Sequence, residues 1–304
     1  MLLVIKWLHE NRQTIAKSAG SLLAVTLLVV LLKEESGEEI TAALKRVSIW
    51  YFLAGIFVMF ISRLLVVNRW HVLLHSAGVE VSFWRTAMLT FTGLFSSNFL
   101  PTTIGGDAVR LAGGMQLGFD RAICLASLVA DRLIGMAGMI ITLPLGLIAI
   151  FPLGSGGLQS ISFAGLFQKG IEFVKRTYDV FVIWFKRPLA LFVSFLSTFG
   201  NMLFIFLAIF LLIIGMGCHV SYWLIAGLWS LTYFVTLIPI SVNGFGVQEL
   251  SLTFLLSEIG GLDHSESLAI AVLVRALFII TSLPGAFFLP SILAAMNNKT
   301  SMPN

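Results

Sequence analysis

Long apolar segments separated by short polar connections make up most of the chain. A hydrocarbon layer about 30 Å thick is crossed by a helix of about 20 apolar residues. Segments of about this length, or slightly shorter, occupy residues 15–32, 48–67, 86–100, 121–151, 188–214, 222–239 and 267–293. The pattern predicts an all-α, polytopic membrane protein with about seven spans, organised as a single transmembrane domain over residues 1–304.

Proline and glycine interrupt this pattern at two places. One apolar helix ends at Pro101 and is followed by Gly105 and Gly106, while another ends at Pro239 and is followed by a Gly-rich turn. Proline cannot donate the hydrogen bond that a continuing helix needs, and glycine lets the backbone turn. We therefore expect broken helices that re-enter the membrane, including a short apolar helix over residues 247–259.

The two interrupted regions, at about residues 86–151 and 222–293, share one order of features. In each, the break is followed by Gly-x-Asp, and an arginine lies twelve positions after that aspartate, at Arg132 in the first region and Arg275 in the second. About three crossings separate the two breaks, and an odd number of crossings turns the second copy over. The order predicts an inverted repeat, as in many transporters, with chance similarity between apolar segments as the alternative.

Residues 154–187 differ from the rest because they contain too many charges for a span. Their apolar residues recur at helical spacing, with basic residues off that face, which is typical of an amphipathic helix at the membrane interface. The apolar face consists of Phe167, Ile171, Val174, Tyr178, Phe181 and Phe185.

The composition excludes an ordinary soluble protein. Hydrophobic residues make up 58% of the chain and charged residues only 11%, whereas soluble domains are about 25% charged. There is no dense basic patch with interleaved aromatic residues, so nucleic-acid binding is not expected. Neither the two cysteines nor the pair His71 and His75 has the spacing of a metal site, and the sequence implies no cofactor or metal.

The basic residues favour a cytoplasmic N-terminus. In that orientation 10 lysines and arginines of the connections lie on the cytoplasmic side and 6 lie outside, as the positive-inside rule requires. The assignment places Arg69 at the cytoplasmic end of a span, with Trp70 beside it as an interfacial anchor. The sequence thus predicts an integral protein of the cytoplasmic membrane of a prokaryote.

Three ionisable residues inside apolar helices, Asp131, Arg132 and Arg275, need compensation. An ionised side chain at such a depth costs about 2.5–3.5 kcal/mol on insertion scales. One interpretation is a buried Asp131–Arg132 pair that fixes helix packing, and the other is a charged path for a polar head group. Small and polar residues on one face of the same helix are expected to face other helices or a cavity, namely Cys124, Ser127, Asp131, Gly135, Gly138 and Thr142.

The breaks supply a second set of polar groups. A half-helix that begins near Asp107 has Arg110 one turn in, and the free N–H groups at the start of a helix attract anions. A tight turn at the membrane surface is the alternative interpretation. The candidate residues for a lipid head group or its path across the membrane are Asn98, Thr102, Gly105, Gly106, Asp107, Arg110, Asp131, Arg132, Asn243, Gly244, Gln248, Glu249 and Arg275.

Three motifs together resemble one known family. They are NFLPTTIGGDAVR at residues 98–110, DRLIG at 131–135, and VNGFGVQE at 242–249, the last followed by Arg275 and by Pro-Gly at 284–285. In this order they resemble the transmembrane region of lysylphosphatidylglycerol synthases, a family also called flippase-like or UPF0104. The resemblance extends from about residue 15 to residue 293.

The resemblance implies lipid translocation without specifying the lipid. The family often has glutamate before the intramembrane arginine, where this chain has Asp131. Synthases of the family also carry a large soluble domain for aminoacyl transfer after the membrane part. Because this chain stops at Asn304, we do not expect it to transfer aminoacyl groups.

The leading hypothesis is an integral-membrane lipid translocator that moves an anionic phospholipid or a lipid-linked intermediate. It is not expected to be an enzyme, since no hydrolase or nucleotide-binding motif is present. One alternative is a membrane-embedded lipid transferase, or an accessory subunit of a lipid- or glycolipid-modifying enzyme, with Asp107, Asp131 or Glu249 as a general base. Another is a secondary transporter for a small anion. A membrane lipid is the expected partner, a membrane enzyme is a candidate partner, and nucleic acid is not expected.

The inverted repeat predicts that the two breaks enter the membrane from opposite faces. Single cysteines introduced by Thr103→Cys and Ser241→Cys should then react with an impermeant thiol reagent from opposite sides of intact cells. Labelling of both positions from the same side would contradict the repeat.

Overall fold

The structure, a computed structural model, describes residues 45–100, 105–150, 184, 186–238 and 242–290. The predicted first span (15–32), almost all of the amphipathic segment (154–187) and Thr102, Thr103 and Ser241 lie outside these residues. Within the described part of the chain the regular elements are helices connected by short turns, without strands. This confirms the predicted all-α fold.

Four of the described helices are long and apolar enough to cross a membrane. They are α4 (Ile49–Ser76), α7 (Arg121–Ile150), α10 (Pro188–Gly215) and α13 (His264–Ser282). Shorter helices lie between them: α5 (Phe83–Ser97), α6 (Gly105–Gln116), α11 (Tyr222–Leu237), the 3₁₀ turn η2 (Val242–Gly244) and α12 (Val247–Glu258). The chain is therefore an integral membrane protein with several spans.

Helices α5 and α11, which we predicted as spans, are shorter than a bilayer is thick. They contain 15 and 16 residues, or about 23 Å at 1.5 Å per residue, against a hydrocarbon layer of about 30 Å. Helix α11 ends because Ile238, which precedes Pro239, has extended backbone angles (φ −66°, ψ 121°). Both helices thus end close to the predicted breaks and are too short to cross a bilayer alone.

Helix α4 corrects the prediction for Arg69 and Trp70. The helix continues to Ser76, well past the predicted end at residue 67, and buries both side chains. Trp70 is fully buried, with its Nε1 donating to the Ser127 hydroxyl at 3.0 Å, and Arg69 pairs with Asp131. The interfacial assignment was therefore wrong, because a partner distant in sequence compensates the charge.

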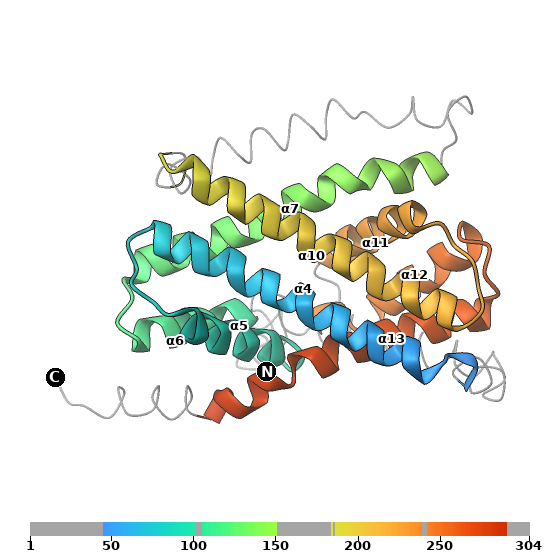
Figure 1. The fold of residues 1–304 in the computed structure, drawn as a ribbon, viewed down its shortest axis with the longest axis horizontal. Coiled ribbons are helices and arrows are strands. Elements are labelled where there is room, and N and C mark those ends of the chain that lie inside the picture. The colour runs from blue at the N-terminus through green and yellow to red at the C-terminus, as the bar shows by residue number, and fades with distance from the viewer. Residues whose placement is uncertain (1–44, 101–104, 151–183, 185, 239–241, 291–304) are drawn as a thin grey trace, which may run out of the picture.

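The two broken regions lie toward opposite ends of the long helices (Figure 1). Ser97 lies against Gly106, and Gly93 lies against both Gly106 and Arg110, so α5 and α6 run antiparallel as a hairpin. In Figure 1 this hairpin occupies the left part of the molecule, while α11 and α12 occupy the right part. The two broken regions thus occupy opposite parts of the described structure, and the inverted repeat stays a prediction.

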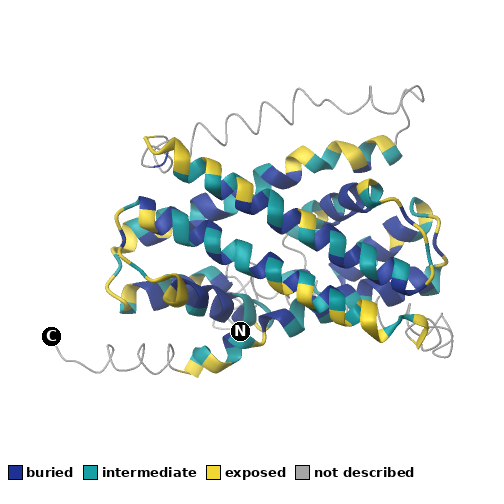
Figure 2. Ribbon diagram, in the orientation of Figure 1, coloured by how far each residue is buried: buried dark blue, intermediate teal, exposed yellow. Residues whose placement is uncertain are grey.

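The first half of helix α10 directs polar side chains toward the protein and apolar side chains toward the outside. Asn201 accepts a hydrogen bond from Ser62 at 2.6 Å, and Ser197 accepts one from Asn68 at 2.9 Å, both from α4. The exposed positions of α10 are instead Leu189, Phe192, Leu196 and Leu203. Figure 2 shows that exposed residues lie on the outward side of the long helices. Hydrogen bonds between polar side chains of neighbouring helices, together with apolar outer faces, are typical of helices that pack in lipid.

The polar face predicted on α7 is confirmed. Cys124, Ser127, Asp131 and Gly138 are buried, and the Thr142 hydroxyl lies 2.6 Å from that of Ser230 on α11. The helix therefore directs its small and polar residues toward its neighbours, as the spacing predicted.

Cys218, in the turn between α10 and α11, is a protonated thiol at neutral pH. Burial raises its pKa to about 11, together with a hydrogen bond to Glu266 and the negative charge of that residue. The sulfur donates to Glu266 Oε2 at 3.2 Å. Because the thiolate is the reactive form, Cys218 should react slowly with thiol reagents.

The crossing of α7 and α11 has no side chain between the two backbones. A methyl group on Gly227 would lie 2.2 Å from the backbone nitrogen of Gly146. Such a contact cannot be relieved by a change of rotamer, so the helices would have to move apart.

We expect Gly227→Ala to destabilise the protein by about 1–3 kcal/mol through overpacking, measured as a lower melting temperature in detergent. Gly200→Ala is the matched control. Its methyl group would meet only the tip of Leu65, 2.9 Å away, a side chain that can adjust. Equal effects of the two substitutions would contradict a close crossing at Gly227.

Candidate functional site

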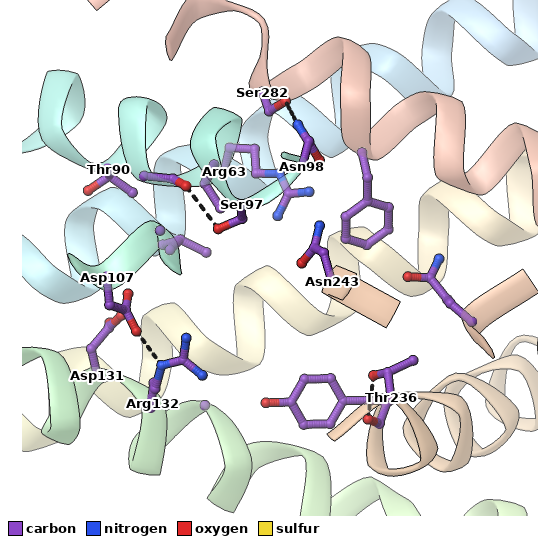
Figure 3. Close-up of a pocket in the computed structure, with 18 of the residues that line it drawn as sticks. Arg63, Thr90, Ser97, Asn98, Asp107, Asp131, Arg132, Thr236, Asn243 and Ser282 are labelled. Atoms are coloured by element: carbon purple, nitrogen blue, oxygen red, sulfur yellow. Dashed lines mark hydrogen bonds and ion pairs between the residues drawn. The ribbon is translucent and has the colours of Figure 1, made fainter. Parts of the chain in front are cut away.

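A pocket of about 330 Å³ lies between the two broken regions. Both regions contribute to its wall: Asn98 and Gly106 from the first, and Asn243 and Gln248 from the second. Figure 3 shows these walls facing one another, with Arg132 and Arg63 extending toward the space between them. The charged side chains that line it are Arg63, Arg69, Asp107, Arg110, Asp131, Arg132 and Arg275.

Five of these side chains form a continuous chain of ion pairs. Asp131, on α7, accepts from Arg69 of α4 at 2.6 Å and from Arg110 of α6 at 3.2 Å. Arg110 also donates to Asp107 at 3.1 Å, and Asp107 pairs in turn with Arg132. Three arginines thus alternate with two carboxylates, and the chain connects α4, α6 and α7.

The second broken region contains an ion pair of its own. Glu249, the third residue of α12, pairs with Arg275 of α13 and also accepts from the backbone N–H of Gly246 at 2.7 Å. Arg275 donates to the Gly244 carbonyl at 3.1 Å and lies over the Phe245 ring at 4.4 Å. The arginine therefore ties the break to the following span.

The conformation of the second break explains its sequence. Asn243, Gly244 and Gly246 have φ of 48°, 72° and 78°, in the left-handed region that glycine and asparagine adopt most easily. The Asn-Gly-Phe-Gly sequence thus lets the chain turn sharply between η2 and α12.

Comparison with known proteins agrees with this architecture. Residues 17–167 and 160–285 match the family described as the lysylphosphatidylglycerol synthase TM region. The chain belongs to this family. The match spans both broken regions, and with them every described residue of the chain of ion pairs and of the Arg275–Glu249 pair.

Two members of the UPF0104 group are similar to parts of the chain. A UPF0104 membrane protein of Methanothermobacter thermautotrophicus is 36% identical over 132 residues, which cover 42% of this chain and 36% of the relative. A UPF0104 membrane protein of Archaeoglobus fulgidus is 25% identical over 119 residues, covering 38% and 36%. The matched stretch thus spans about a third of each relative's length.

The family's intramembrane acid, Asp131, does not pair with the arginine beside it. Asp131 binds Arg69 and Arg110, whereas Arg132 binds Asp107. Consecutive residues of a helix point about 100° apart and do not face one another. The proposed Asp131–Arg132 pair is therefore wrong, although Asp131 does fix helix packing.

The two broken regions place equivalent ion pairs at equivalent positions. Asp107 and Glu249 are each the third residue of their short helix, and each pairs with the arginine of the next long helix. The separations are 25 residues in the first region and 26 in the second. Of the two Gly-x-Asp aspartates, Asp120 accepts from the Ile123 N–H at 2.9 Å as a helix cap, whereas Asp263 precedes α13 without a capping hydrogen bond from its side chain.

Most of the predicted site residues converge on the pocket. The residues that line it are Asn98, Gly106, Asp107, Arg110, Asp131, Arg132, Asn243, Gln248 and Arg275. Gly105, Gly244 and Glu249 are not among its lining residues, and Thr102 lies outside the described part of the chain. Asn98 donates to Ser282 at 2.9 Å and so joins α5 to the end of α13.

Arg63 is a pocket residue that the sequence interpretation missed. Only 7% of it is exposed, its Nε donates to the Thr281 hydroxyl at 3.4 Å, and its guanidinium lies 4.5 Å from the centre of the Phe278 ring. An arginine within the apolar run 48–67 was a visible signal of the same kind as Arg132. Trp229 and Tyr233 also line the pocket. Nothing in the sequence distinguishes them from aromatic residues that face lipid.

Several buried polar atoms at the pocket have no hydrogen-bond partner in the described structure. They are Nε and Nη2 of Arg110, Nε2 of Gln248, Nε1 of Trp229 and Oγ1 of Thr90. Buried donors without partners are costly, and a ligand or a water molecule in the pocket would complete these ones. The wall of the pocket is thus rich in positive charge and in unused donors.

Removal of the Asp131 charge should destabilise the protein strongly. Asp131→Asn leaves Arg69 and Arg110 without their shared carboxylate, and breaking a buried ion pair costs about 3–5 kcal/mol. Thermal unfolding in detergent measures the loss.

A second substitution tests which arginine is the partner. Adding Arg69→Met to Asp131→Asn should recover part of the stability, because it removes an uncompensated charge. Adding Arg132→Met should recover none, since that arginine belongs to Asp107. The observed pairing would be contradicted if Arg132→Met, and not Arg69→Met, restored stability to the Asp131→Asn protein.

Proposed function

We propose that this protein is a lipid translocator, which moves an anionic phospholipid or a lipid-linked intermediate across the membrane. The observation that carries the proposal is the basic pocket between the two broken regions. Five arginines line it against two carboxylates, within a chain that otherwise faces lipid. A polar head group could be held there while the bilayer solvates the acyl chains.

The donors at the pocket suit an anionic head group. The guanidinium of arginine is planar, stays charged when desolvated and binds phosphate oxygens in pairs. Helices α6 and α12 both begin beside the pocket, with Gly106 and Gln248 in its wall, and the start of a helix favours negative charge. An anion therefore finds both fixed charges and backbone dipoles there.

Exposed apolar residues beside the pocket favour a lipid over a small free anion. Phe99 directly follows the pocket residue Asn98 and is 70% exposed, and Leu283 directly follows Ser282 and is 44% exposed. A head group in the pocket would leave its acyl chains next to these side chains. A transporter for a small anion has no need of an apolar border at its site.

The ion pairs argue against the transferase alternative. Asp107, Asp131 and Glu249, the three candidate bases, are each held by at least one arginine. A carboxylate engaged in this way is poorly placed to take a proton from a substrate. The proposed activity is therefore transport without covalent chemistry.

The membrane and the orientation of the protein in it are proposed as well. We place the protein in the cytoplasmic membrane of a prokaryote with the N-terminus in the cytoplasm, as the distribution of basic residues favours. A membrane enzyme that makes or uses the lipid is the expected partner.

A reconstituted assay tests the proposed function. Liposomes containing the purified protein should equilibrate a labelled anionic lipid between leaflets faster than protein-free liposomes. Arg132→Lys and Arg275→Lys should slow this exchange about tenfold or more, because lysine keeps the charge but loses the paired donors.

Arg46→Lys serves as the control for charge-conserving substitution. Arg46 is 55% exposed at the side chain and pairs with Glu266 away from the pocket, so exchange should stay at the level of the unmodified protein. Equal rates for Arg46→Lys, Arg132→Lys and Arg275→Lys would show that arginine geometry at the pocket does not matter.

A further inference from the structure

We infer that this protein binds hydroxyl groups on the head group of its lipid, and that Tyr233 and Asn243 are the specificity-determining residues that bind them. The inference rests on the proposed function and specifies its substrate class, namely an anionic lipid whose phosphate carries a polyol. Its basis is a set of uncharged hydrogen-bonding groups that one side of the pocket leaves without partners.

The two broken regions contribute different chemistry to the pocket. Of the described lining residues, the first region contributes four that are charged, whereas the second contributes one, Arg275, which pairs with Glu249. The other polar groups of the second region in the lining are amides, hydroxyls and one indole N–H. Figure 3 shows Asp107 and Arg132 on one side of the pocket and Thr236 on the other. The pocket thus has a charged side and an uncharged polar side.

Tyr233, on α11, presents a free hydroxyl on the uncharged side. Its side chain lines the pocket, and no group of the described residues forms a hydrogen bond with its hydroxyl. Tyr222, at the start of the same helix, instead donates to the Leu203 carbonyl at 2.9 Å and is not a lining residue. Because a tyrosine hydroxyl both donates and accepts, Tyr233 can bind either a donor or an acceptor of a ligand.

Asn243 presents a free amide on the same side. It lies in the turn that opens the second break, with φ of 48°, and Figure 3 shows its side chain within the pocket. Among the described residues its amide has no hydrogen-bond partner, whereas the amide of Asn98 donates to Ser282 at 2.9 Å. Asn98 therefore joins two helices, while Asn243 keeps two donors and an acceptor for a ligand.

Two buried donors adjoin these groups. Nε2 of Gln248 and Nε1 of Trp229 have no partner in the described structure. Both residues line the pocket, and they are 8% and 4% exposed. Donors buried to this extent are costly to leave unpaired. The uncharged side of the pocket therefore favours a ligand that offers it hydrogen-bonding atoms.

A hydroxyl group matches this combination. Its oxygen accepts from N–H donors such as those of Gln248 and Trp229, and its proton can go to the oxygen of Tyr233 or Asn243. A phosphate beside the arginines of the charged side would place the hydroxyls attached to it on the uncharged side. A head group that ended in an alkyl chain would leave the same protein groups unpaired.

Binding to the purified protein in detergent tests the inference. Dioleoyl phosphatidylglycerol and dioleoyl phosphatidylmethanol have the same acyl chains and the same single charge, but the methyl head group has no hydroxyl. A ligand of the folded state raises the melting temperature according to its concentration relative to Kd, so a thermal-shift titration compares the two affinities. We expect phosphatidylglycerol to bind about tenfold more tightly, because it gains hydrogen bonds to the uncharged side. Equal affinities, or tighter binding of phosphatidylmethanol, would overturn the inference.

Tyr233→Phe tests the first assigned residue, because it removes the hydroxyl and keeps the ring. The affinity for phosphatidylglycerol should fall about threefold to fivefold with the loss of one hydrogen bond, and the affinity for phosphatidylmethanol should stay the same. Tyr222→Phe is the matched control and should leave the preference between the two lipids unchanged. A merely structural role of Tyr233 would lower both affinities alike, and that result, or an unchanged preference, would contradict the assignment.

Asn243→Gly tests the second residue without straining the backbone. Glycine adopts a positive φ easily, so the turn is kept while the amide is lost. The preference for phosphatidylglycerol should again fall about threefold to fivefold, and it should nearly disappear in the protein that also carries Tyr233→Phe. A double variant with the full preference would show that neither residue binds the hydroxyls.

A soluble probe distinguishes a lipid from a free phosphodiester. Glycerophosphoglycerol has the phosphate and the hydroxyls of phosphatidylglycerol but no acyl chains. Binding much weaker than that of phosphatidylglycerol supports a lipid head group as the ligand. Binding as tight as that of phosphatidylglycerol would overturn the lipid assignment.

The liposome assay separates this inference from the proposed function. Exchange of both lipids between leaflets, together with equal affinities, would leave the translocator intact and refute the recognition of hydroxyls. No exchange of either lipid, together with preferential binding of phosphatidylglycerol, would refute translocation while the assignment of Tyr233 and Asn243 stands.

Discussion

The carboxylate of Asp131 is the contact on which the centre of this protein depends. It is almost fully buried, and its two oxygens are shared between an arginine of α4 and an arginine of α6. Without it, two guanidinium groups would face one another in a region of low dielectric, where like charges repel strongly. One acid on α7 therefore helps to hold α6, which also packs against α5, in the first wall of the pocket.

The protein combines an apolar core with polar contacts between its helices and an apolar outer face. Serine, threonine and asparagine side chains join α4 to α10 in the interior, and leucine and phenylalanine cover the outside. In water such a protein would expose its apolar faces and bury its charges at a loss. In lipid the same pattern is stabilising, because apolar contacts between helices gain little there and polar contacts hold them together.

Local sequence patterns predicted the helices and breaks of the fold better than they predicted which charged side chains pair with one another. The polar face of α7 was visible from Cys124 to Thr142 because helical periodicity places those residues together. The two breaks were visible because proline and glycine act locally. The partner of Asp131 was not visible, because Arg69 lies 62 residues away and reaches it only after α4 and α7 have packed. Arg132 was predicted as the partner because it follows Asp131 in the sequence, but consecutive residues of a helix point in different directions.

For the pocket, too, local sequence patterns did not show which distant residues correspond. The motifs identified residues from both walls, since each motif contains an arginine or an acid beside a break. They gave no indication that Asp107 and Glu249 occupy the same position of their helices, because GGDAVR (105–110) and VQELSL (247–252) share no letter in register. That equivalence is a property of backbone geometry and not of residue identity.

The contact between Gly146 and Gly227 sets the distance between two helices of the protein. These glycines belong to α7 and α11, one from each broken region, and their backbones meet without intervening side chains. No side chain larger than hydrogen fits between the two backbones there, since packed interiors tolerate little overlap. The two helices are therefore held at a fixed separation, so one helix from each broken region is joined to the other at a single close crossing.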